Sequence, residues 1–125
     1  MSTAEDCLFC SIVAGGIPAD VVHETATTLA FRDVNPQAPT HVLVVPRSHV
    51  ANAAELAQAE PETLVHLFDA AREIAAAEGI APTEGADGAE GGYRLVFNTG
   101  ARAHQTVFHA HLHVLGGRSL TWPPG

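Results

Sequence analysis

The alternation of apolar and polar residues along the chain predicts most of its secondary structure. Five β-rich runs, separated by turn residues, predict strands at 21–24, 28–33, 41–46, 93–98 and 109–115. Only the third and fourth runs have a helical pattern between them. This order, with few crossover helices, favours an α+β fold with a mostly antiparallel five-stranded sheet.

One long helix and one or two short ones complete the predicted fold. Asn52 followed by Glu55 resembles a capping box, and Pro61 suits the first turn of a longer helix. Gly79 is expected to end that helix. Its core-facing stripe is predicted from residues at helical spacing, which are Leu64, Leu67, Phe68, Ala71, Ile74 and Ala75. A short helix is expected over 6–14.

Length and charge limit the class of protein. The 125 residues fit one domain, 1–125, with a flexible N-terminus expected at about 1–5, a mobile Gly- and acid-rich loop at 81–92 and a C-terminal tail at 118–125 whose end is stiff. The net charge is −8 and the six basic residues are scattered arginines, which argues against a nucleic-acid groove. No apolar run has the length of a membrane span, and the acidic N-terminus is unlike a signal peptide. A cytoplasmic location is therefore expected.

Histidine occupies every second position at the start of the last β-rich run. Because strand side chains alternate between faces, His109, His111 and His113 are expected on one side of the sheet. Imidazole serves as nucleophile, acid, base or metal ligand. The row therefore indicates either a metal site or a site for proton transfer and nucleophilic attack, and the alternative is a polar, His-rich sheet face.

The two cysteines form a C-x-x-C motif, Cys7 and Cys10. A redox-active pair is expected beside a βαβ unit, whereas consecutive strands follow here. Metal binding is the favoured interpretation, and a tetrahedral zinc site needs about two further ligands, for which eight histidines are available. The alternative is that both cysteines are packing residues and hold no metal.

Three separated motifs together carry a family resemblance. They are FRDVNPQAPTH at 31–41, QTVFHAHLHVL at 105–115, and the ending formed by LGGR at 115–118 and WPPG at 122–125. In this order they resemble the histidine-triad (HIT) superfamily, and within it the Hint branch of purine nucleoside phosphoramidases. The resemblance spans residues 7–125. It implies a HIT fold whose five-stranded sheets are joined across a homodimer.

The resemblance also implies a reaction. His111 would attack the α-phosphorus of an AMP or GMP derivative, and water would then hydrolyse the nucleotidyl-histidine. His113 would neighbour the scissile P–N bond and help protonate the departing amine. A neutral imidazole nucleophile needs its second nitrogen oriented, which a backbone carbonyl or His41 would do.

The same resemblance implies the nucleotide contacts. Asp33 would receive the ribose hydroxyls, the alternative being a carboxylate that bonds its own turn. The phosphate or leaving group would be held by Asn98, Gln105 and Thr106, although His104 stands where the family commonly carries glycine. The walls around the base would be Phe9, Ile12, Ile17, Phe31, Val34 and Leu43. Trp122, in the tail, would reach toward the partner's active site.

A structural zinc ion is implied as well, with no organic cofactor. The matching ligand positions are Cys7, Cys10, His49 and His109, a closed set that leaves His111 and His113 free for chemistry. Two other function classes remain open. One is a purine-nucleotide sensor or interaction module with incidental turnover, and the other is a metalloenzyme whose three triad histidines bind one catalytic metal.

Overall fold

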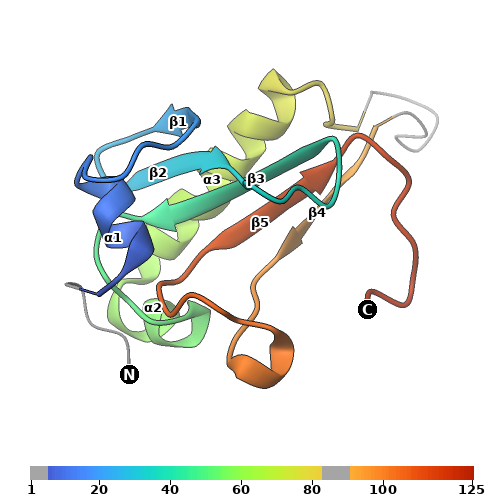
Figure 1. Ribbon diagram of the computed structural model, residues 1–125. Helices are drawn as coiled ribbons and strands as arrows, with labels where there is room; N and C mark the ends of the chain where they lie inside the picture. The colour runs from blue at the N-terminus through green and yellow to red at the C-terminus, as the bar shows by residue number, and fades with distance from the viewer. Residues whose placement is uncertain (1–5, 83–90) are drawn as a thin grey trace.

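The computed structural model describes residues 6–82 and 91–125 as a five-stranded antiparallel sheet with helices packed on it (Figure 1). The elements are α1 (Leu8–Val13), β1 (Val21–Glu24), β2 (Thr28–Arg32), β3 (Thr40–Pro46), α2 (Ala53–Ala59), α3 (Pro61–Ala77), β4 (Tyr93–Val96), η2 (Ala101–Ala103) and β5 (Leu112–Gly116). The spatial order of the strands is β1-β2-β3-β5-β4. The predicted α+β fold is confirmed. Within the described residues, no helix is long and apolar enough to cross a bilayer.

The sheet separates two apolar cores. On one face, α2 and α3 pack against alternate residues of the central strands, among them Val42, Val44 and Leu112. On the other face, Phe9 of α1 packs with Phe31 and Leu43. Because successive strand residues point to opposite faces, one set of strands supplies both cores. The candidate site lies on the α1 face.

The last β-rich run differs from its prediction. A strand was predicted from His109, but β5 begins only at Leu112. The backbone just before it is bonded outside the sheet: the N–H of Ala110 donates to the carbonyl of Val50, and the carbonyl of His109 accepts from the ring of His111. These groups are therefore not available to the strand ladder.

The helical region after β3 consists of two helices, and each begins at a residue that favours a helix start. The side chain of Asn52 accepts the N–H of Glu55 and begins α2, and Pro61 begins α3. Glu60 between them has φ −141 and ψ 66, because the ring of a following proline disfavours helical backbone. The predicted stripe is wrong at Phe68, which is 43% exposed and packs edge-on against Phe97. Thr63 and Ala70 are buried on this face instead.

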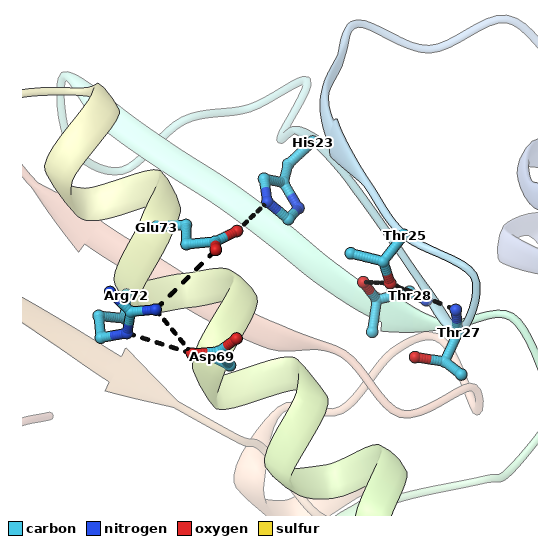
Figure 2. Close-up of polar contacts among 7 residues, drawn as sticks. All are labelled: His23, Thr25, Thr27, Thr28, Asp69, Arg72 and Glu73. Atoms are coloured by element: carbon cyan, nitrogen blue, oxygen red, sulfur yellow. Dashed lines mark hydrogen bonds and ion pairs between the residues drawn. The ribbon is translucent and has the colours of Figure 1, made fainter.

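Polar contacts fix the hairpin of β1 and β2, one of them to α3 and others within its own turn (Figure 2). A bulge between Val21 and His23 brings His23 opposite Ala30, whose side chain faces α3. There Nε2 of His23 lies 2.7 Å from Oε2 of Glu73. In the connecting turn, the Thr25 hydroxyl accepts the N–H of Thr28 at 3.0 Å. The outer strand is thereby held against the helix.

Candidate functional site

His111 is buried immediately before β5, with 7% of its surface exposed. Its Nδ1–H donates to the carbonyl of His109 at 2.7 Å, so Nε2 carries the lone pair in the neutral ring. Burial lowers the pKa of His111 below its usual 6.5 and so favours the neutral form. Of the two orienting groups expected from the sequence, the structure has the backbone carbonyl. This arrangement leaves one nucleophilic nitrogen on a fixed ring.

His41 and His113 form a second hydrogen-bonded pair. The backbone N–H of Gln37 donates to Nδ1 of His41 at 3.0 Å, so this nitrogen is an acceptor and the proton of neutral His41 is on Nε2. That Nε2 lies 2.9 Å from Nδ1 of His113 and donates to it. The proton of neutral His113 is therefore on its own Nε2. One backbone amide thus fixes the tautomers of two side chains.

His113 presents this Nε2–H as a spare donor. The atom is buried and has no hydrogen-bond partner among residues 6–82 and 91–125. Burial, together with the neighbouring His111 and His41, lowers the pKa of His113 to about 4. The ring centroids of His111 and His113 are 5.0 Å apart. A buried polar group without a partner is costly, so this N–H is a feature that a bound substrate would use.

Asp33 belongs to the same group of residues. One carboxylate oxygen accepts the N–H of Asn35 at 2.8 Å, which is the turn bond considered as the alternative to ribose binding. The other lies 3.5 Å from Nε2 of His41. Ligand atoms of Asp33, His41 and His113 lie within 4.8 Å of one another, but the two histidines already bond each other. Asp33 therefore combines a local structural bond with a place beside the histidines.

A second group of side chains, here called the Cys/His cluster, consists of Cys7, Cys10, His49 and His109. Their ligand atoms lie within 4.8 Å of one another. Nδ1 of His109 is 3.3 Å from Sγ of Cys7 and 3.4 Å from Sγ of Cys10, and Nδ1 of His49 is 3.3 Å from Sγ of Cys10. The fold thus brings together the four residues expected to bind metal from α1, the segment after β3 and the segment before β5.

The cluster has the donor set of a zinc site. With Zn–S near 2.3 Å and Zn–N near 2.0 Å, a tetrahedral ion separates sulfur from nitrogen by roughly 3.6 Å, close to the observed distances. Nε2–H of His109 donates to the carbonyl of Pro46 at 2.8 Å, so the lone pair on Nδ1 faces the sulfurs. Such a bond to the non-ligating nitrogen is typical of metal-binding histidines.

The residues predicted to surround the base are partly brought together. Phe9, Phe31 and Leu43 share the α1-side core, and Ile12 packs at its edge. Ile17 and Val34 are exposed, at 38% and 101%. The contact of both residues with the base remains a prediction. The side chain of Val34 is exposed and so can contact a ligand.

The residues predicted to hold the phosphate have different surroundings. Thr106 is exposed and Asn98 half-buried. Gln105 is 3% exposed, and its amide bonds the N–H of Gly100 and the carbonyls of Ala51 and Val107. Its side chain therefore ties this loop together in the structure, and phosphate contact remains a prediction.

Near the site, one residue has an unusual backbone conformation, and backbone groups form the hydrogen bonds that orient the histidines. His104, at the position where glycine was noted for the family, has φ 69, in the left-handed region that glycine favours. The groups that set the histidine tautomers, the Gln37 amide and the Pro46 and His109 carbonyls, are also backbone. Sequence reasoning missed Gln37 and Pro46 because a backbone donor or acceptor has no residue signature.

Trp122 lies beside Arg94 of β4. Its ring is 80% exposed, and the guanidinium of Arg94 on β4 lies 5.9 Å from the ring centroid. Its predicted role at a partner's active site remains a prediction.

Together, the fold and the site define an α+β protein in which the buried, oriented imidazole of His111 lies beside a Cys/His cluster with the donor set of a metal site. The HIT domain family matches residues 14–120. The chain therefore belongs to the HIT family.

Relatives from several organisms extend this finding. An uncharacterized HIT-like protein of Synechococcus elongatus is 49% identical over 122 residues, which cover 98% of this chain and 99% of that protein. A 14 kDa zinc-binding protein of Zea mays is 41% identical over 120 residues, covering 94% and 87%.

Solved structures agree with the fold. A HIT family hydrolase from Legionella pneumophila superposes with a TM-score of 0.83 at 47% identity, covering 95% of this chain and 99% of that one. A histidine triad nucleotide-binding protein from Candida albicans gives a TM-score of 0.78 at 30% identity, covering 95% and 84%.

Proposed function

We propose that this protein hydrolyses the P–N bond of purine nucleoside 5′-phosphoramidates, as a member of the Hint branch, and releases AMP or GMP. The observation that carries the proposal is the orientation of His111, whose Nδ1–H is held by the His109 carbonyl while Nε2 keeps its lone pair. A hydrolase and a nucleotide-binding protein among the structural relatives support the substrate class.

In the first step, Nε2 of His111 forms a bond to the α-phosphorus and the bond to the amine nitrogen breaks. His113 is in the donor tautomer, and its Nε2–H hydrogen-bonds the departing nitrogen, which takes up a proton from solvent and leaves as the amine. Water then attacks the phosphorus and gives up a proton to solvent, and the P–N bond to His111 breaks. The products are a nucleoside monophosphate and the restored imidazole.

Other residues are proposed to position the nucleotide. Asp33 accepts hydrogen bonds from the ribose, since a carboxylate offers two acceptor oxygens for two hydroxyls. Asn98, Gln105 and Thr106 surround the phosphate and stabilise its developing charge. The base packs against Phe9, with the other apolar residues of the α1 face.

The Cys/His cluster is proposed to hold a structural Zn²⁺ ion. The donor set, the spacing of ligand atoms and the oriented His109 ring support this, as does the zinc-binding relative. When bound, zinc would supply a closed four-ligand crosslink between the N-terminal segment and the triad segment.

A homodimer is proposed through the β4 edge. β4 is an outer strand of the sheet, and the exposed ring of Phe68 lies against Phe97 beside it. An open strand edge next to apolar surface is a natural pairing surface. The tail with Trp122 follows this side of the molecule and would reach the partner.

The test is release of AMP from adenosine 5′-phosphoramidate by the wild-type chain and by His111→Ala, with AMP binding measured on both. Wild-type turnover that is lost in the variant, together with a nucleotidyl adduct detected by mass spectrometry, supports the proposal. Tight AMP binding without turnover would instead indicate a nucleotide sensor. Turnover that needs metal and forms no adduct would indicate a metalloenzyme and would refute the covalent route.

A further inference from the structure

His109 is shared between the Cys/His cluster and the nucleophile. Its ring faces the sulfurs of Cys7 and Cys10, and its backbone carbonyl accepts the Nδ1–H of His111. Its Nε2–H is fixed on the carbonyl of Pro46. The ring and the carbonyl belong to one residue with 0% exposure. Because its surroundings are closely packed, a shift of the ring toward a metal also shifts the carbonyl that holds His111.

Phe9 makes a second connection. It lies between Cys7 and Cys10 in α1, and its ring packs edge-on against His111 with centroids 5.0 Å apart. It also contacts His109, at 6.0 Å. The residue proposed to line the base is therefore carried by the same turn that carries both cysteines.

Helix α1 depends on such attachments. It has only six residues, and helices this short are not stable in isolation because nucleation is unfavourable. Its buried residue is Phe9, and its N-cap is Cys7, whose sulfur accepts the N–H of Cys10 at 3.3 Å. The position of the Phe9 ring is consequently set by its packing in the α1-side core and by what holds the two cysteines.

We infer that metal occupancy of the Cys/His cluster positions His111 and Phe9, so that metal binding and nucleotide binding strengthen each other. The inference rests on the proposed nucleotide site. His109 and Phe9 act here as positioning residues, and zinc as a regulator of nucleotide affinity rather than a passive crosslink. A site that is already ordered loses less freedom when its ligand binds.

Thermodynamic linkage makes the inference measurable without turnover. If zinc raises the affinity for AMP by some factor, AMP must raise the affinity for zinc by the same factor. We expect about tenfold, within the usual range of such couplings. AMP affinity is measured by calorimetry on zinc-loaded and chelator-stripped full-length chain, with circular dichroism confirming the fold. Zinc affinity is measured by competition with a chromophoric chelator, with and without AMP.

Two variants separate the connections. His49→Asn removes a ligand that does not touch His111 and is expected to weaken zinc binding. Its AMP affinity should be low at limiting zinc and recover at saturating zinc, a rescue that also serves if the stripped wild type loses its fold. Phe9→Leu keeps all four ligands and the His109 connection, so its zinc affinity without AMP should match wild type, while the coupling factor should fall by the part that Phe9 carries. His66→Gln, an exposed histidine outside the cluster, is the control.

The outcomes are distinct. Equal factors well above one, with a smaller coupling factor in Phe9→Leu, support the inference. If AMP binds equally with and without zinc, and zinc equally with and without AMP, the inference is refuted while the proposed function stands. If no sample binds AMP, the nucleotide site itself is refuted, and the coupling with it.

Discussion

At the residue scale, the tautomers of three imidazoles follow from the backbone groups that they meet. An amide N–H can only donate and a carbonyl can only accept, so the Gln37 amide and the His109 carbonyl determine which ring nitrogens carry protons. His111 is left with a bare nitrogen and His113 with a spare N–H. Two neighbouring, chemically identical side chains thus present a lone pair and an N–H donor.

Replacing His41 tests this assignment. In His41→Ala, Nδ1 of His113 loses its donor, so the two neutral tautomers of His113 become mixed. We expect phosphoramidate turnover to fall by tenfold or more and the free energy of unfolding to fall by about 1–3 kcal/mol. ¹⁵N NMR of the His113 ring reports the tautomer directly. His41→Gln, whose amide can still donate, is the matched variant, and an unchanged tautomer in His41→Ala would contradict the argument.

At the scale of elements, an ion pair connects the sheet to the end of the long helix. Arg32 at the end of β2 makes two hydrogen bonds to Glu78 just after α3, at 2.7 and 3.1 Å. Gly79, with φ 73, follows at once, and the Ile80 amide bonds the carbonyl of Ala75 and closes the helix. The hydrogen bond from Arg32 lowers the pKa of Glu78 below 4.5.

This pair predicts an acid-dependent loss of stability. Because the pKa of Glu78 is lower in the folded chain than in the unfolded chain, its contribution is present above pH 4.5 and is lost as pH falls through the folded value. Urea unfolding at a series of pH values should show wild type more stable than Glu78→Gln near pH 7, with the difference shrinking below pH 4.5. A difference that is independent of pH would count against the pair.

The sequence predicted these elements well where a side chain carried the signal. The limits of β1 match the prediction, and those of β2, β3 and β4 differ by one or two residues, because turn residues and prolines mark strand ends. The start of β5 was wrong because it depends on backbone bonds of His109 and Ala110. The prediction that Phe68 is buried was wrong, because helical spacing does not reveal how wide a stripe of α3 the sheet covers.

At the scale of the whole molecule, the sheet has two free edges, β1 and β4. The four residues predicted from the family resemblance to bind metal are brought together by the fold from positions 7 to 109. The pattern alone does not determine which edge would form the proposed homodimer, since both outer strands are four residues long.

Two substitutions distinguish the edges. Phe68→Glu places a charge beside β4, whereas Val21→Glu, at a residue 44% exposed on β1, places the same charge at the opposite edge. We expect sedimentation velocity to give a dimer for wild type and for Val21→Glu, and a monomer for Phe68→Glu, since a buried unpaired charge disfavours association. Dissociation by Val21→Glu alone would assign the interface to β1.

The separation of two cores by one sheet has a consequence for how such a chain can diversify. Packing against α3 and the proposed contact with a nucleotide draw on opposite side chains of the same strands. Substitutions on the two faces that share no partners add nearly independently in free energy. Drift or selection for new substrates can therefore act on the α1 face while the helical face preserves the scaffold.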